Sequence, residues 1–124
     1  MPRALGPGLL LAMALGNVAL AQVPTPFDGR YAGELRLIQV IDGDCTTPPL
    51  GALYPLTEYG GQVRFAYVPR FATTLTGSVA PNGSFTASAR TKRGVVRMTG
   101  QIRGNAVRAQ LVSSSCRYDF ATKY

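Results

Sequence analysis

The sequence contains no histidine and no tryptophan, and only two of its 124 residues are cysteine. Without histidine, a Ser-His-Asp or Cys-His catalytic arrangement and a histidine-ligated metal site are excluded. Two cysteines are too few for a zinc or iron–sulfur site held by thiolates alone. Acidic residues are also scarce, because six Asp and Glu stand against thirteen Lys and Arg, for a formal net charge of +7. We therefore expect a small basic protein without a metal or a cofactor.

The longest apolar run lies near the N-terminus and is too short to span a membrane. It extends from Leu9 to Leu20, about twelve residues, whereas a spanning helix needs about 20. Arg3 precedes the run, and its end, Ala19-Leu20-Ala21, has the small-x-small pattern of a cleavage site. We therefore expect a signal peptide over residues 1–21 rather than an uncleaved anchor. The mature protein is then soluble and either periplasmic or extracellular.

Export would place the two cysteines, Cys45 and Cys116, in an oxidising compartment. In an oxidising compartment, two thiols of one small domain usually pair. We expect a Cys45–Cys116 disulfide rather than two free buried thiols. A redox-active role would require a Cys-x-x-Cys spacing, which the sequence lacks, so the expected role is structural.

Beyond the signal peptide, apolar and polar residues alternate with a period of two, and no helical stripe is found. Leu35, Leu37 and Ile41 share one parity, for example, and short turns such as Pro81-Asn82-Gly83 separate the later runs. Alternating runs joined by such turns are typical of an antiparallel meander with one wet face. The pattern predicts about seven strands, at residues 30–41, 62–68, 71–79, 84–91, 95–102, 106–112 and 115–122.

Prolines interrupt the alternation between Asp42 and Gly61, and we expect a long loop there. Residues 22–29 are expected to be a short tether, and residues 30–124 a single all-β domain. Its apolar face has to be covered, which predicts a small up-and-down barrel or a two-layer sandwich. Small inward residues such as Gly77 and Gly100 favour the barrel. Six inward aromatic side chains leave little room for a ligand inside it: Tyr31, Phe65, Tyr67, Phe85, Tyr118 and Phe120.

Turn positions also predict the register of two hairpins. A turn at Gly104-Asn105 sets Met98 opposite Leu111, and a turn at Arg93-Gly94 sets the register of the preceding hairpin. Both registers keep apolar residues opposite apolar residues.

Several short motifs resemble those of a group of small exported bacterial β-rich proteins, a domain of unknown function. The motifs are an opening Phe27-Asp28-Gly29-Arg30-Tyr31-Ala32-Gly33, two Thr-Gly hairpins at residues 75–85 and 99–105, and a closing Cys116-Arg117-Tyr118-Asp119-Phe120. The likeness covers most of residues 27–124. It implies a bacterial secreted or periplasmic β domain and brings no catalytic residues. The size, the single disulfide and the location are also similar to those of periplasmic barrel inhibitors of metalloproteases, in architecture only, because no inhibitory motif matches.

Enzyme chemistry finds little support in the remaining residues. Asp42-Gly43-Asp44 is the only close pair of carboxylates in the sequence, and paired carboxylates can serve glycoside hydrolysis or calcium binding. The residues that follow do not supply the further oxygen ligands of a calcium loop, so we expect a solvated turn. Ser113-Ser114-Ser115 has no nearby base and is expected to be a polar turn. We therefore expect no enzymatic activity.

Positive charge is concentrated in the second half of the chain, where no acid lies between Glu58 and Asp119. With the turn at Arg93-Gly94, Arg90 would lie directly opposite Arg97, with Arg108 on the next strand. Facing like charges destabilise a sheet unless an anion lies between them, and guanidinium groups grip carboxylate or phosphate well. We predict an anion-binding face, with a merely solvated basic surface as the alternative. Five outward arginines form this face: Arg64, Arg90, Arg97, Arg108 and Arg117.

These observations favour a non-enzymatic binding or inhibitory module for an anionic envelope polymer or an acidic protein surface. Its contact surface is expected to be either the basic sheet face or the Pro-rich loop between Asp42 and Gly61. The alternative is a structural or accessory envelope protein without a discrete site, and a hydrolase is more distant. Nucleic acid is not expected as a partner, because outward aromatic residues for base stacking are scarce.

Overall fold

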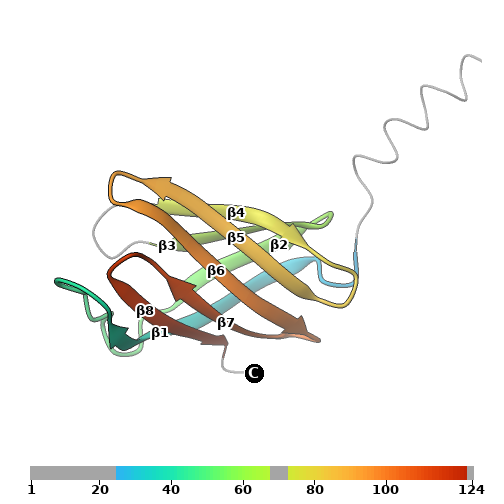
Figure 1. Ribbon diagram of the computed structural model, residues 1–124. Coiled ribbons are helices and arrows are strands. Elements are labelled where there is room, and N and C mark those ends of the chain that lie inside the picture. Colours follow the sequence, from blue (N-terminus) through green and yellow to red (C-terminus); the bar gives the residue numbers. More distant parts are fainter. Residues whose placement is uncertain (1–24, 68–72, 123–124) are drawn as a thin grey trace, which may run out of the picture.

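The computed structural model describes residues 25–67 and 73–122, and this part of the chain is all-β. Each strand pairs antiparallel with the next, and β1 also pairs with β8, so the sheet closes into a barrel (Figure 1). The expected meander is confirmed, as a barrel rather than a sandwich. The strands are β1 (Gly29–Val40), β2 (Tyr54–Tyr59), β3 (Gln62–Tyr67), β4 (Thr73–Val79), β5 (Ser84–Thr91), β6 (Gly94–Arg103), β7 (Ala106–Val112) and β8 (Cys116–Thr122).

Four of the predicted features fall wholly or partly outside the described residues. The expected signal peptide, residues 1–21, lies outside them, as do the first residues of the expected tether. The end of the strand predicted at 62–68 and the start of the one predicted at 71–79 also lie outside them.

Strand β2 lies within the stretch that was expected to be a loop up to Gly61, so that expectation is wrong for residues 54–59. Proline is disfavoured inside a sheet because it lacks a donor N–H. Pro55, however, is the second residue of β2, and pairing with β3 begins one residue later, at Leu56 opposite Phe65. The proline therefore costs no hydrogen bond to β3.

The barrel interior is filled with side chains. Phe65 and Phe120 pack edge to face with their ring centroids 5.1 Å apart, and the ring of Tyr54 lies 6.5 Å from that of Phe65. Of the six aromatic residues expected inside, five are buried and Tyr67 is partly buried against the core. The largest side chains with almost no exposure are Tyr118, Phe65, Phe120, Leu56, Leu75 and Met98.

Inward glycines let neighbouring strands and rings approach closely. A Cβ atom on Gly77 would lie 2.7 Å from Cα of Ala87 on β5, and one on Gly33 would lie 2.7 Å from the ring of Phe120 on β8. Both distances are too short for any residue with a side chain. These positions allow the sheet to coil tightly enough to close with only eight strands.

Strand β1 changes partner along its length. Residues Gly29–Gly33 pair with β2, and residues Gly33–Val40 pair with β8, with a register shift between Leu37 and Gln39. This bulge puts one extra residue into β1 and reverses the facing of the residues after it. Ile41 was expected to face inward with Leu35, but just beyond the end of β1 it is 45% exposed.

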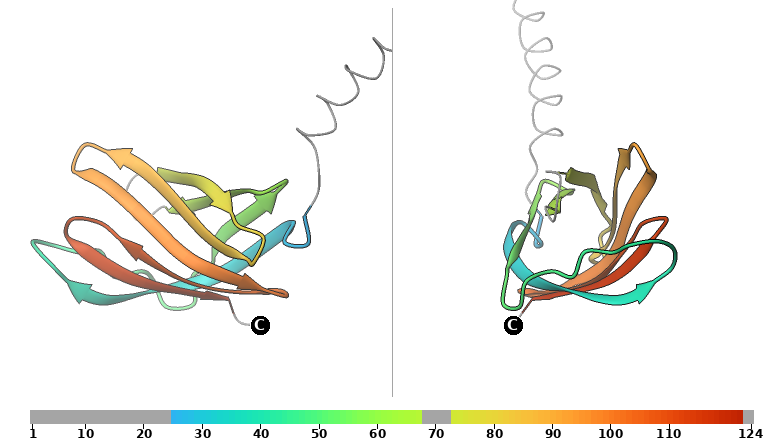
Figure 2. Two further views of the ribbon diagram at one scale, coloured as in Figure 1. Left: turned by 45° about the vertical axis from the view of Figure 1, so that its right-hand side comes forward. Right: turned by 90° about the vertical axis from the view of Figure 1, so that its left-hand side faces the viewer.

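The segment from Ile41 to Leu53 leads from β1 to β2 across one end of the barrel (Figure 2). The predicted disulfide between Cys45 and Cys116 is present and joins this segment to the start of β8, with the two Cα atoms 5.8 Å apart. The hydroxyl of Tyr118 donates a hydrogen bond to the carbonyl of Thr46 at 2.8 Å. Ile41 and Asp42 donate backbone hydrogen bonds to the carbonyl of Ser115. The segment is therefore attached to β8 at several points.

Candidate anion-binding site

The five arginines of the predicted anion-binding face all lie on strands and outside the hydrophobic core. Their outward direction follows from the alternation of each strand, because the residues beside them are the buried ones. Four are exposed, namely Arg64 on β3, Arg90 on β5, Arg97 on β6 and Arg108 on β7, and Arg117 on β8 is half-buried.

The predicted register that set Arg90 directly opposite Arg97 is wrong. Thr91 pairs with Gly94, so the turn consists of Lys92-Arg93, and Arg97 lies opposite Ser88. The hydroxyl of Thr91 closes this turn, because it accepts a hydrogen bond from the N–H of Arg93 and donates one to the carbonyl of Gly94. Arg90 is consequently a diagonal neighbour of Arg97, two residues further along β5.

The other predicted neighbour of Arg97 is also placed elsewhere. The predicted register of β6 and β7 is confirmed, with Met98 opposite Leu111, and it sets Arg108 opposite Gln101. Gln101 is four residues beyond Arg97 on β6, which corresponds to about 13 Å along a strand. Arg64 lies on β3, opposite Thr57 and Thr76, with β4 and β5 between it and β6. Arg64 and Arg108 therefore do not belong to one cluster with Arg97.

The structure instead brings together Arg97 and Arg117. Val112 on β7 lies directly opposite Arg97 on β6 and directly opposite Arg117 on β8, so the three residues form one row across three strands. Two strand spacings separate the arginines, about 10 Å between backbones, which two long side chains can bridge. The Nε atom of Arg117 is buried and has no hydrogen-bond partner among the described residues. This row thus contains one buried donor without an acceptor among the described residues, beside the exposed guanidinium of Arg97.

A surface hollow lies beside this row. Its volume is about 340 Å³, and it is lined by Val95, Arg97, Thr99, Val112, Ser113 and Ser114. One charged group and three hydroxyl groups thus surround it, and guanidinium and hydroxyl donors are groups that bind carboxylate or phosphate oxygens. Ser113 accepts hydrogen bonds from the backbone of Ser115 and Cys116, which holds the turn before β8 in place.

A single acidic residue occurs in the sequence of β5 to β8, and it is Asp119. It lies directly opposite Arg36 on β1 and Gln110 on β7, and Gln110 approaches its carboxylate to 3.5 Å. Asp119 is thus in the row Thr99-Gln110-Asp119, next to the row of Arg97 and Arg117. Arg97 is the one charged residue in the lining of the hollow.

A second group of ionisable side chains was missed by the sequence analysis. Asp28 and Glu58, far apart in sequence, meet at the opposite end of the barrel through Thr25, whose Oγ1 lies 3.0 Å from Asp28 Oδ1 and 3.1 Å from Glu58 Oε1. Glu58 is 2% exposed and accepts a hydrogen bond from the N–H of Gly61. Leu56 and Glu58 are two residues apart and therefore lie on the same face of β2. Recognition of β2 as a strand would have predicted that the carboxyl of Glu58 points inward.

The pKa values of the two carboxyl groups are shifted in opposite directions. Burial raises the pKa of Glu58, and the neighbouring carboxyl of Asp28 raises it further, against smaller opposite effects of Gly61 and Thr25. Burial also acts to raise the pKa of Asp28, but hydrogen bonds with Gly60, Glu58 and Thr25 outweigh it and lower this pKa. As the pH falls, Glu58 therefore takes up a proton before Asp28 does. The hydrogen bonds of the two carboxyl groups with Thr25 and Gly60 hold residues 25–28 against the β2–β3 turn.

Glu58→Gln is expected to stabilise the protein at neutral pH and to do so less in acid. Because the pKa of Glu58 is raised in the folded state, its contribution to stability is present below its ordinary value near 4.5 and is lost as the pH rises through the folded-state pKa. The glutamine side chain keeps an oxygen for Gly61 and never ionises. Urea unfolding of both proteins between about pH 4 and pH 7 measures this difference. Asp42→Asn, at an exposed carboxyl, is the control, and a stability difference independent of pH for Glu58→Gln would contradict the assignment.

The remaining predicted positions show no built site within the part of the chain that the structure describes. Asp42 and Asp44 are both exposed. Residues 25–67 and 73–122 contain no group of three or more His, Cys, Asp or Glu side chains arranged to hold a metal ion. No helix among these residues has the length and apolar character needed to cross a membrane.

Comparison with protein-family models, with curated proteins and with solved structures gave no match. The resemblance of the short motifs to a group of exported bacterial proteins stays a prediction. The function of this protein therefore has to be inferred from its own residues.

Proposed function

We propose that this protein is an exported, disulfide-bonded binding module of the bacterial cell envelope that recognises an anionic partner. The contact surface is the row Arg97-Val112-Arg117 on β6, β7 and β8, together with the hydroxyl-lined hollow beside it. The observation that carries the proposal is the pair of arginines flanking Val112, with a buried Nε of Arg117 that no described protein group satisfies. A carboxylate or phosphate placed there would accept hydrogen bonds from both guanidinium groups.

Two further features support the proposal. The apolar run at residues 9–20 and its small-x-small end favour export, and the disulfide fits an oxidising compartment. The barrel interior is filled by aromatic side chains, so recognition takes place on the outer surface. The anionic polymers and acidic protein surfaces of the envelope present carboxylate and phosphate groups of the kind that this row would bind.

Replacing both arginines of the row, Arg97→Gln with Arg117→Gln, is expected to weaken binding to heparin about tenfold. A tenfold loss corresponds to about 1.4 kcal/mol in all. This is less than two full charge-assisted hydrogen bonds of about 1.5–3 kcal/mol each, because solvent screening weakens contacts at the surface. Fluorescence anisotropy with labelled heparin, across a salt series, measures the affinity, which should fall as salt rises.

The matched control is Arg64→Gln with Arg108→Gln, which removes the same charge from strand positions outside the row. A discrete site predicts a loss of about twofold or less for this pair, because only long-range attraction changes. Equal losses for both pairs would indicate diffuse attraction and contradict a site. The absence of saturable binding would support a structural protein instead.

A further inference from the structure

Exposed apolar side chains gather at one place on the described surface. Seven large hydrophobic residues of the described chain are exposed, and five of them lie at the end of β1 or in the segment that follows it. They are Ile38, Val40, Ile41, Leu50 and Leu53, and Leu50 is fully exposed. Contiguous exposed apolar residues mark interaction surfaces in soluble proteins more often than scattered ones do.

The same place has a strand edge that none of the described strands covers. β2 pairs with β1 only up to Gly33, while β1 continues to Val40 with β8 on its other side. From Leu35 to Val40, one edge of β1 pairs with β8. The other edge, which pairs with β2 up to Gly33, faces the β1–β2 segment in this stretch. Such an edge is a template for pairing with another extended chain.

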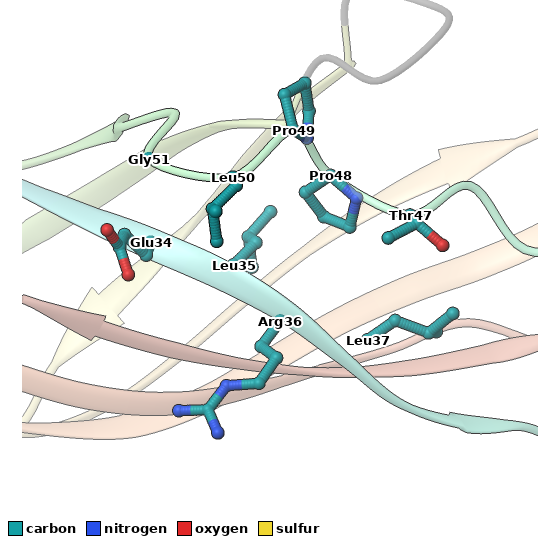
Figure 3. Close-up of a pocket in the computed structure, with 9 residues that line it drawn as sticks. All are labelled: Glu34, Leu35, Arg36, Leu37, Thr47, Pro48, Pro49, Leu50 and Gly51. Atoms are coloured by element: carbon teal, nitrogen blue, oxygen red, sulfur yellow. The ribbon is translucent and has the colours of Figure 1, made fainter.

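A hollow of about 420 Å³ separates this edge from the β1–β2 segment, with Glu34–Leu37 on one side and Thr47–Gly51 on the other. Figure 3 shows Leu50 pointing from the segment toward β1, whereas Arg36 points away from the segment. Pro48 and Pro49 have no N–H to donate, so this part of the segment cannot form a regular ladder with β1. We call this hollow, with the edge of β1 from Leu35 to Val40, the β1 edge groove.

The far wall of the groove is held in place. The disulfide and the hydrogen bond from Tyr118 to Thr46 fix the segment just before Pro48, and Ala52 donates a backbone hydrogen bond to Pro49 just after it. A ligand entering the groove would therefore not have to order this wall, which reduces the entropy cost of binding.

We propose that the β1 edge groove binds an extended, basic segment of a partner protein. An extended segment can pair with the open edge of β1, and its alternate side chains would reach Leu35, Leu37 and Leu50. The charge of the occupant follows from the surroundings. Glu34 and Arg36 line the groove, and Arg36 points away from the segment (Figure 3). From Leu37 to Leu53 the chain has no Lys or Arg, and its only charged residues are Asp42 and Asp44, both exposed. Within a protein of net charge +7, this end of the groove is locally acidic and complements a cationic segment.

The test uses a synthetic peptide of about seven residues, long enough to span the edge at ~3.3 Å per residue, in which valine and threonine alternate between two terminal lysines. Titration into the ¹⁵N-labelled protein, followed by NMR, should shift the amide signals of residues 35–40 and 47–53. Methylation of two alternate backbone nitrogens removes the donors needed for strand pairing and should weaken binding about tenfold. Glutamate in place of the lysines should weaken it further as the salt concentration is lowered.

Protein variants locate the interaction. Leu50→Ser should weaken peptide binding about fivefold, because it removes an apolar contact of the groove. Tyr59→Ser is the matched control, since Tyr59 is an exposed apolar residue on β2, outside the groove, and should leave affinity unchanged.

Several outcomes would overturn the proposal. These are shifts confined to β6–β8, equal affinity for the methylated peptide, or no binding at about 1 mM peptide. Dimerisation of the protein alone in analytical ultracentrifugation, abolished by Leu50→Ser and not by Tyr59→Ser, would show that a second copy of this chain occupies the groove instead.

Discussion

Removing the Cys45–Cys116 disulfide is expected to lower the free energy of unfolding by about 2–5 kcal/mol. The bond closes a long loop, since the two cysteines are 71 positions apart in the sequence. The chain-entropy estimate for a loop of this length is about 4 kcal/mol. Because small domains have a net stability of about 5–15 kcal/mol, the reduced protein should be close to unfolding. Urea unfolding with and without reductant measures the difference.

The double variant Cys45→Ser with Cys116→Ser provides the control, because reductant should have no effect on it. Reduction should also loosen the segment from Ile41 to Leu53, which faster amide exchange at Ala52 would reveal. If denatured protein releases two free thiols per chain without reductant, the bond does not form and the expectation is wrong.

Phe65→Ala is expected to lower the free energy of unfolding by about 3–5 kcal/mol, the usual cost of deleting a buried aromatic ring. Phe65 has no exposed surface, and its ring contacts those of Phe120 and Tyr54 on two other strands. The cavity would lie where β1, β2, β3 and β8 share the core. Urea unfolding is again the measurement.

Tyr59→Ala is the control for this prediction, because Tyr59 is an aromatic residue on β2 that is 62% exposed. Its replacement should change stability by about 0.5 kcal/mol or less. If Phe65→Ala does not fold, Phe65→Leu provides a smaller loss that can be measured. A Phe65→Leu variant as stable as the original protein would contradict the central position of this ring.

The alternating pattern of the sequence was sufficient to predict an all-β meander and most of its strands. It predicted these strands because the side-chain period of a strand is two and one face of each strand is buried. Cysteine chemistry predicted the pairing of Cys45 with Cys116 from the expectation of an oxidising compartment, without knowledge of the fold. The outward direction of the arginines also followed from alternation.

Three features of the candidate sites depended on tertiary structure. The sequence analysis missed β2 because the strand contains Pro55 and proline is disfavoured within a sheet. Pairing of β2 with β3 starts only after that residue. Asp28 and Glu58 meet because β2 is a strand whose inward face carries Glu58. The β1 edge groove exists because β1 changes partner at Gly33, and no local pattern shows where a strand changes partner.

The register of β5 and β6 shows most clearly why the alternation was insufficient. The predicted register, with Arg90 opposite Arg97, and the observed one, with Ser88 opposite Arg97, differ by two residues. A shift of two leaves every side chain on the same face of the sheet, so burial of the apolar face cannot distinguish the registers. The hydroxyl of Thr91 and the fit of the strands around the closed barrel select between them. The sequence by itself thus determined that these arginines face outward, and the tertiary structure decided that Arg97 lies in one row with Arg117 across Val112.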